Sequence, residues 1–192
     1  MNHFPVVLDI ETKFTFRDFA DPKKLGISVA VLYDYQDKQG KVFFEKDVSK
    51  MFPILERSSY IVGYNVKSFD MQVLQGYYPG NVENLQTFDI LDEIKEKIGR
   101  RLALNDVIHA TLGLKKSGHG LMAIEMYKEG RFDELQKYCM DDVMLTKALF
   151  EYGIEKGEIF YIDEVGKKSI KVDWKKYMEE GGKKEMSLTL PF

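Results

Sequence analysis

The chain contains little cysteine and lacks any long apolar run. Cys139 is the one cysteine among 192 residues, so no disulfide can close within the chain, and a reducing, cytoplasmic setting is expected. No stretch reaches the ~18 consecutive apolar residues of a membrane-spanning helix, and the N-terminus lacks the basic and apolar regions of a secretion signal. We therefore expect neither secretion nor membrane insertion.

Positive charge does not dominate the chain either. The formal net charge is -3 and the sequence pI is about 5.7, which argues against a protein that holds nucleic acid by bulk charge alone. A protein that uses metal ions for that purpose is still compatible with this balance. With 44% hydrophobic and 31% charged residues, the composition is that of a globular protein with one substantial core.

Two acids interrupt the first apolar run of the chain, Pro5–Thr12. Runs of this kind are typical of buried strands, in which residues i and i+2 face the same way, so Asp9 and Glu11 project from one face. A core does not hold two adjacent carboxylates unless something cationic satisfies them. The alternative is an edge strand with an exposed acidic face, and the run alone does not decide between the two.

The hydrophobic pattern predicts a mixture of strands and helices. Strands are expected at 26–35, 41–45, 60–65 and 85–91, helices at 48–58, 68–74 and 104–112, and a terminal hairpin at 159–162 and 169–174. Asn65 and Asp70 fall at a junction between a strand and a helix, where α/β proteins place ligands. Asp89 is interpreted as a helix cap ahead of Asp92.

The last long helix is predicted from Asp133 to Gly153, with a capping-box pattern at its start and the glycine as its C-terminal cap. Tyr138 and Asp142 are four residues apart and share one helix face. Their stripe adjoins the one expected to face the core, so both side chains should lie at the edge of the core. Asp141 points about 100° away around the helix.

Acids at marked positions therefore come from three separated segments: Asp9 with Glu11, Asp70, and Asp142. Carboxylates that converge in one site repel each other unless divalent cations lie among them. Oxygen ligands of this kind suit Mg2+ or Mn2+. Two such ions ~4 Å apart form a clamp for in-line displacement at phosphorus, so the predicted chemistry is phosphodiester hydrolysis.

Three motifs in the chain resemble those of the DEDD 3'-5' exonucleases. Residues 9–11 match D-x-E, residues 65–70 match N-x-x-x-F-D, and Tyr138 with Asp142 matches Y-x-x-x-D. In this order and at these separations, they make the chain similar to the proofreading exonuclease domain of family B DNA polymerases. The similarity covers about residues 4–153.

The resemblance implies an α/β, RNase H-like fold with a mixed five-stranded sheet flanked by helices, to which the predicted terminal hairpin adds a C-terminal β-hairpin extension. We therefore expect an exonuclease domain at 1–155, and the residue pattern beyond it predicts a hairpin extension at 156–178 and a flexible linker with an apolar tail at 179–192. Lys137 stands where the histidine subclass has its histidine, so the tyrosine subclass, DEDDy, is expected.

Roles for single residues also follow from the resemblance. Two Mg2+ or Mn2+ ions are expected, and the implied metal ligands are Asp9, Glu11, Asp70 and Asp142. Tyr138 would orient the attacking water, because a phenol with a reference pKa of ~10 is a poor general base. The residues expected to hold or shape the end of the substrate are Thr12, Asn65 and Phe69.

The expected function is metal-dependent removal of 5'-mononucleotides from the 3' end of single-stranded DNA. One alternative is an exoribonuclease acting on RNA 3' ends, because the motifs do not report on the 2'-hydroxyl. Another is a non-catalytic module that binds nucleic acid or a sliding clamp. The retention of all four acids and Tyr138 argues against that module, which has no need to keep repelling acids together.

Two segments are not accounted for by the motifs. The aromatic residues of 13–19 could stack on terminal bases or pack over the sheet, and packing is the preferred interpretation. Ser187–Phe192 resembles the hexapeptide Q-L-x-L-x-F by which bacterial replication proteins dock on the sliding clamp, with serine in place of glutamine. A tail that packs on its own domain or stays disordered is the alternative.

Overall fold

A computed structural model describes residues 4–115, 118 and 120–178 and contains a mixed five-stranded sheet of order β3-β2-β1-β4-β5. The central strand β1 (Val6–Thr12) pairs antiparallel with β2 (Ile27–Asp34), which pairs antiparallel with β3 (Gln39–Phe44). On its other side β1 pairs in parallel with β4 (Ile61–Gly63), which pairs in parallel with β5 (Thr87–Asp89). The predicted fold class is confirmed.

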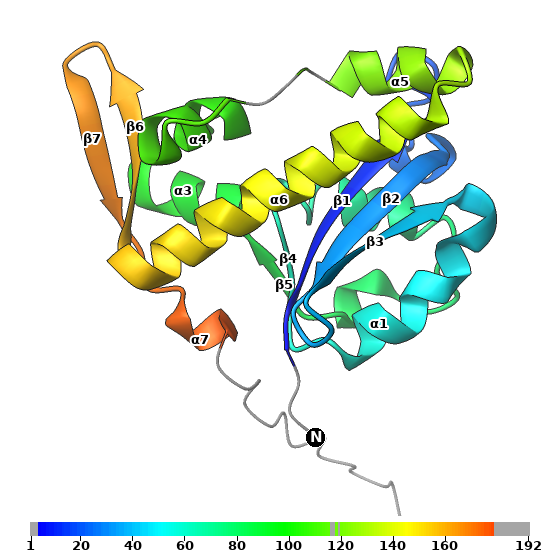
Figure 1. Ribbon diagram of the computed structural model, residues 1–192, viewed down its shortest axis with the longest axis horizontal. Coiled ribbons are helices and arrows are strands. Elements are labelled where there is room, and N and C mark those ends of the chain that lie inside the picture. Colours follow the sequence, from blue (N-terminus) through cyan, green and yellow to red (C-terminus); the bar gives the residue numbers. More distant parts are fainter. Residues whose placement is uncertain (1–3, 116–117, 119, 179–192) are drawn as a thin grey trace, which may run out of the picture.

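Four helices supply the larger apolar core on one face of the sheet. The 25-residue helix α6 (Phe132–Lys156) crosses this face, flanked by α5 (Gly120–Lys128), α3 (Ile90–Ile98) and α4 (Leu104–Leu112) (Figure 1). Helix α5 was not predicted. The strand expected at 85–91 is shorter than predicted, because its last two residues open α3.

Shorter helical segments pack on the opposite face. They are η1 (Pro22–Lys24), η2 (Glu45–Met51), α1 (Phe52–Arg57), α2 (Asp70–Leu74) and η3 (Val82–Asn84). The helix predicted at 48–58 is therefore a 3-10 segment followed by a short α-helix. Each face of the sheet has its own buried cluster, so β1 is covered on both sides.

The alternation along β1 decides which way its acids point. Val6 and Leu8 belong to the cluster beneath α1 and α2, whereas Val7 belongs to the cluster beneath α6. Because successive side chains of a strand face opposite sides, Asp9 and Glu11 follow Val7 and point toward α6. The edge-strand alternative is wrong, since β1 lies at the centre of the sheet.

Helix α6 is longer than predicted at its C-terminal end. It continues through Gly153 and ends at Gly157, whose φ of 68° makes it the left-handed cap. The predicted capping box at 133–136 is not formed, since the N-cap is Arg131 and makes no side-chain cap bond. Gly153 instead lies against Trp174, and a Cβ built on it would stand 2.2 Å from a ring carbon.

The predicted terminal hairpin is present as β6 (Glu158–Asp163) and β7 (Gly166–Lys171), followed by α7 (Lys175–Met178). Thr111 fixes α4 to the hairpin, because its hydroxyl donates to the carbonyl of Phe160 at 3.1 Å and accepts from its N–H at 2.9 Å. In the described part of the chain, no helix is both long and apolar enough to cross a membrane.

Asp34, at the end of β2, is a buried carboxylate with two cationic partners. Its side chain is 1% exposed and accepts from Lys41 at 3.0 Å and from Arg57. Burial raises the pKa of Asp34, but hydrogen bonds from Lys41, Arg57 and a backbone N–H outweigh burial and hold it below its ordinary value. The charged form therefore stabilises the fold.

We expect Asp34→Asn to lower the free energy of unfolding by about 2 kcal/mol at pH 7, the scale of a lost charge-assisted hydrogen bond. Because the folded pKa of Asp34 is depressed, this stability is present above the unfolded pKa of ~3.9 and disappears as pH falls through the folded pKa. Urea unfolding at pH 7 and at pH 3 measures it. Asp37→Asn removes a 42% exposed partner of the same cations and should cost under ~1 kcal/mol. An undiminished Asp34→Asn effect at pH 3 would contradict this account.

Candidate active site

Three of the four predicted metal ligands meet where β1 passes under α6. Oxygen atoms of Asp9, Glu11 and Asp142 all lie within 4.8 Å of one another. The strand supplies the first two from one face, and α6 supplies the third, which is 1% exposed. Residues 133 positions apart in the sequence are thus brought into one acidic cluster, which we call the acidic triad.

The spacing of the acidic triad fits a divalent cation. Mg2+ and Ca2+ bind oxygen at about 2.0–2.6 Å, so two ligands on opposite sides of one ion stand roughly 4–5 Å apart. The cluster's 4.8 Å limit agrees with this geometry. Hard carboxylate oxygens are also the donors that Mg2+ and Mn2+ prefer.

Asp70, the fourth predicted ligand, lies beside the acidic triad but is not one of its members. Its Oδ1 accepts a hydrogen bond from the backbone N–H of Ile10 at 2.7 Å, so this oxygen is turned to β1. Burial, followed by the charge of Asp9, raises the pKa of Asp70 well above its ordinary value. A nearby cation would remove this cost, because it favours the charged form of the carboxyl group.

The Cys139 thiol is a contact of the site that the sequence did not indicate. Its Sγ lies 3.3 Å from Oδ2 and 3.5 Å from the backbone oxygen of Asp9, so the thiol donates to that residue. Cys139 is fully buried, on the side of α6 that faces the sheet. Burial and the charges of Asp9 and Glu11 raise the pKa of the thiol well above its ordinary value.

We expect native Cys139 to resist alkylation. The thiolate is the reactive form of cysteine, and neither reagent nor solvent reaches a side chain that is 0% exposed. Incubation with iodoacetamide at pH 8, followed by mass spectrometry, should leave the folded protein unlabelled over the period in which urea-denatured protein is fully labelled. Rapid labelling of the folded protein would show that α6 does not cover β1 here.

The junction between β4 and α2 is built around Asp89. Its carboxylate accepts from the backbone N–H groups of Asn65 and Lys67, both at 2.9 Å. It also accepts from Leu91 N–H at the start of α3, so its predicted role as a helix cap is confirmed. These bonds hold Asn65 at a φ of 65°, an uncommon conformation for a residue other than glycine.

A second link to this junction comes from the loop between α3 and α4. Arg101 donates from Nη2 to Oδ1 of Asn65 at 2.6 Å, and the Tyr64 hydroxyl donates to the carbonyl of Leu102 at 2.9 Å. Sequence reasoning missed Arg101, since nothing in the pattern connects it to Asn65. The contact places a guanidinium group beside a residue of the predicted substrate site.

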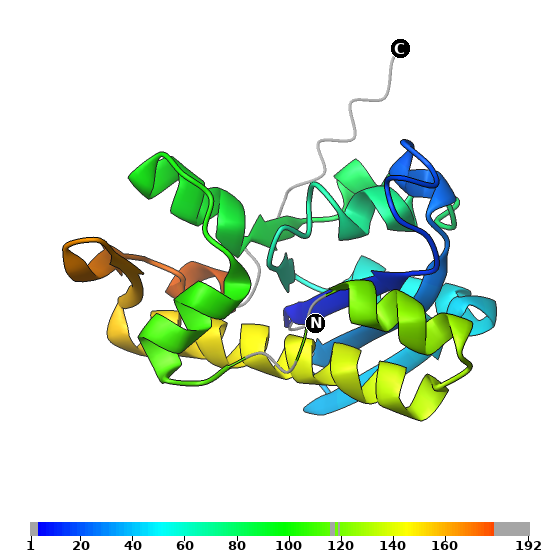
Figure 2. The same cartoon turned by 90° about the horizontal axis from the view of Figure 1, so that it is seen from above.

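An open cleft of about 410 Å3 brings most predicted site residues together. Its lining includes Asp9, Glu11, Thr12, Asn65, Phe69 and Asp70, together with Gly120, Leu121 and Ile124 of α5. Figure 2 shows α5 lying over the same end of β1. Tyr138 and Asp142 do not line this cleft. Tyr138 is 4% exposed, and a Cβ on Gly118 would come within 3.2 Å of its ring.

The aromatic residues after β1 are exposed, so the preferred packing interpretation is wrong. Phe14, Phe16 and Phe19 are 40%, 55% and 39% exposed, and the first two line the cleft. Phe16 lies edge-on to Phe69 at 6.0 Å between ring centroids. The loop is fixed by its own polar contacts, in which Thr15 donates from both its N–H and its hydroxyl to the Asp18 carboxylate at 2.8 Å.

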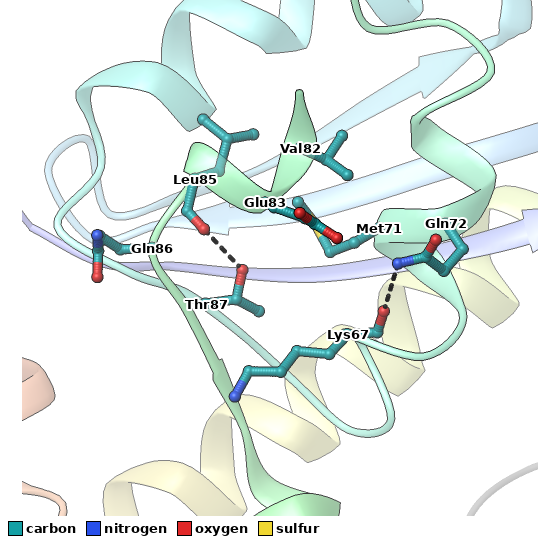
Figure 3. Close-up of a pocket in the computed structure, with 8 residues that line it drawn as sticks. All are labelled: Lys67, Met71, Gln72, Val82, Glu83, Leu85, Gln86 and Thr87. Carbon is teal, nitrogen blue, oxygen red and sulfur yellow. Dashed lines mark hydrogen bonds between the residues drawn. The ribbon is translucent and has the colours of Figure 1, made fainter. Parts of the chain in front are cut away.

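Another hollow, of about 460 Å3, lies beyond α2 next to β5 (Figure 3). Its lining is Lys67, Met71, Gln72, Val82, Glu83, Leu85, Gln86 and Thr87. Several of its polar groups bond to nearby backbone, such as Gln72 to the carbonyl of Lys67 at 3.2 Å. Glu83 supplies the lone carboxylate among these lining residues, so this hollow does not gather the acids that the cleft gathers.

Comparisons with known proteins place this geometry in context. A model of the RNase H superfamily matches residues 6–154. The chain is similar in fold to the family B DNA polymerase from the hyperthermophilic archaeon Pyrobaculum calidifontis, with a TM-score of 0.63 and 20% sequence identity. That match covers 80% of this chain and 25% of the polymerase chain, so this chain spans about a quarter of the polymerase's length. No curated protein matches the chain.

Proposed function

The chain belongs to the RNase H superfamily, and from this membership we propose that it is a DEDDy-type 3'-5' exonuclease acting on single-stranded DNA. The observation that carries the proposal is the acidic triad, Asp9, Glu11 and Asp142, at the end of β1 beside a cleft. Similarity to a DNA polymerase fold supports nuclease chemistry. The choice of DNA and of 3' ends rests on the resemblance of the three motifs to the proofreading domain.

In this proposal the chain's own residues hold the metal site and the strand end. Asp9, Glu11 and Asp142 would hold the cations, and Asp70, whose Oδ1 accepts from Ile10 N–H, would join them as a ligand. Two bound Mg2+ or Mn2+ ions supply activation of a water and stabilisation of the leaving oxygen. Without such ions, repulsion between the neighbouring carboxylates makes their charged forms unfavourable.

The remaining roles concern positioning. Tyr138 orients the attacking water from the α6 face that it shares with Asp142. Thr12, Asn65 and Phe69 hold the terminal nucleotide, and all three line the cleft. Asn65 is fixed at both ends, by Asp89 through its backbone N–H and by Arg101 through its side chain. The part of the cleft that contacts the strand end is therefore fixed before binding.

The experiment that tests this function uses purified protein and a 5'-labelled single-stranded DNA oligonucleotide with Mn2+. Stepwise shortening of the labelled strand indicates removal from the 3' end, and EDTA should stop it. A matched RNA strand distinguishes an exoribonuclease. Cleavage from the 5' end, or shortening that continues in EDTA, would overturn the proposal.

Docking on a sliding clamp through Ser187–Phe192 stays a sequence-based prediction, because these residues lie outside the described part of the chain.

A further inference from the structure

A hollow of about 370 Å3 lies where β3, α5 and α6 meet, outside the acid-lined cleft. Its lining is Lys13, Ser28, Phe44, Glu45, Lys46, Tyr127 and Phe132. Its volume falls within the ~300–1,000 Å3 of typical ligand sites, and its lining combines aromatic rings with a few convergent polar groups. None of these residues has a role in the proposed reaction.

Three aromatic rings form the apolar part of this hollow, which we call the aromatic cup. The ring centroid of Phe132 lies 5.9 Å from that of Phe44, at an interplanar angle of 83°. It lies 6.0 Å from that of Tyr127, at 70°. Phe132 is 45% exposed although it belongs to this cluster. Nearly perpendicular rings offer a flat ligand one face to stack on and one edge to meet.

A buried hydroxyl faces the same space. Ser28 is 2% exposed, and its Oγ has no hydrogen-bond partner among the described residues. A buried hydroxyl without a partner costs free energy, and in native structures such groups are uncommon. A ligand that carries a donor or acceptor on the edge of its ring would satisfy this group.

The charged residues of the lining decide whether the hollow favours a cationic or an anionic ligand. Lys13 is ion-paired with Glu45, and its Nζ lies 5.3 Å from the ring centroid of Tyr127. The place where an aromatic cage would receive a cation is therefore already filled by a lysine. Lys46 forms no ion pair within the described residues, so two lysines against one glutamate leave a net positive charge. The hollow therefore favours an anionic ligand.

We propose that this hollow binds a nucleotide, with the base in the aromatic cup, a polar atom of the base at Ser28, and the phosphate at Lys46. The ligand class follows from the proposed function, because a nuclease meets nucleotides both as free product and as residues of its strand. Helix α5 borders both places, since Leu121 and Ile124 line the cleft and Tyr127, one turn further on, lines the hollow.

Calorimetric titration in EDTA tests the site without hydrolysis. One arm uses dTMP as the free nucleotide, and the other uses an oligothymidylate as the strand. Phe132→Ala should weaken binding about tenfold, the scale of a lost base stack. Phe132→Leu, which keeps apolar volume, should recover little of this loss. Lys46→Ala should weaken binding several-fold and reduce the salt dependence by about one phosphate contact.

Two controls separate this hollow from the rest of the surface. Lys50→Ala removes a neighbouring lysine whose side chain is 72% exposed and should leave binding unchanged. Phe16→Ala changes the cleft, where the proposed function also places a nucleotide, so it should affect only binding in the cleft and leave the Phe132-dependent part of dTMP binding unchanged. Binding of dTMP that depends on Phe132 identifies a free-nucleotide site, and dependence seen with the oligonucleotide alone identifies a strand site.

Either of these results supports nucleotide binding in the hollow. Absence of saturable binding in both arms, or binding that responds to Phe16→Ala and not to Phe132→Ala, would overturn it. The two proposals can be told apart. A protein that binds dTMP through Phe132 but does not shorten DNA with Mn2+ would contradict the exonuclease function and leave the nucleotide site in place.

Discussion

We expect Asp142→Ala to reduce the proposed shortening of DNA 3' ends by at least about 10³-fold while the protein stays folded. The carboxylate of Asp142 lies within 4.8 Å of those of Asp9 and Glu11, and it is the contribution of α6 to the acidic triad. A metal ion held by such a cluster supplies several kcal/mol of transition-state stabilisation. Each ~1.4 kcal/mol lost costs a factor of ten in rate. The initial rate of shortening of a 5'-labelled oligonucleotide with Mn2+ measures the effect.

Asp141→Ala is the matched control, because it removes the same group one position earlier. The Asp141 side chain is 41% exposed and pairs with Lys137 at 3.2 Å on the surface of α6. Exposed ion pairs at this spacing contribute only about 0.3–0.5 kcal/mol to folding stability. Because Asp141 is also outside the acidic triad, the rate should stay within about twofold of the parent. An inactive Asp141→Ala beside an active Asp142→Ala would mean that the other face of α6 carries the chemistry.

Thermal unfolding gives a readout of the same residue that does not depend on activity. Mn2+ should raise the Tm of the parent protein, because a ligand that binds the folded state stabilises it by mass action. The rise should be lost in Asp142→Ala. In EDTA the variant should unfold no earlier than the parent, since two clustered carboxylates repel less than three. A Tm rise of equal size in both proteins would place the cation elsewhere.

The acidic triad could be predicted from the sequence because both of its parts follow from local periodicity. The alternation of β1 fixes Asp9 and Glu11 on one face, and the helical repeat fixes Asp142 one turn beyond Tyr138. The motif order then supplied the one non-local step, that these segments meet. Local pattern did not give the depth of burial, and Tyr138 and Asp142 are buried rather than at the edge of the core.

The contacts that escaped prediction are those between distant residues with no shared pattern. Arg101 and Asn65 are 36 residues apart, and Cys139 and Asp9 are 130 apart. Neither arginine nor cysteine carries a periodic signal that would indicate its partner. The exposure of Phe16 was missed for another reason, because the loop's own hydrogen bonds hold it away from the core. Hydrophobic type alone predicts burial, and polar contacts within a loop can override it.

Gly153 is another residue whose contacts could not be predicted from the sequence, and the effect of these contacts on the free energy of unfolding can be measured. From sequence it was a helix cap, and in the structure it is an interior residue of α6 beneath Trp174, which is 0% exposed. Gly153→Ala should lower the free energy of unfolding by about 2–3 kcal/mol. A new Cβ would stand 2.2 Å and 2.4 Å from two indole carbons, and the indole is held by Phe150 and Phe88. Overpacking of this kind costs ~1–3 kcal/mol or more.

The sign of this effect separates packing from helix propensity. Alanine is favoured over glycine inside a helix by up to ~1 kcal/mol, so propensity alone predicts that Gly153→Ala raises the Tm. Packing predicts a fall of roughly 5–10 °C in a domain of this size. Gly120→Ala at the start of α5 is the control, since no atom lies within 4 Å of its Cβ position and its stability should not fall. In a Trp174→Leu background, the smaller side chain should remove most of the loss of stability caused by Gly153→Ala. If the loss persists in that background, the strain lies in the helix backbone and not in the contact with the indole.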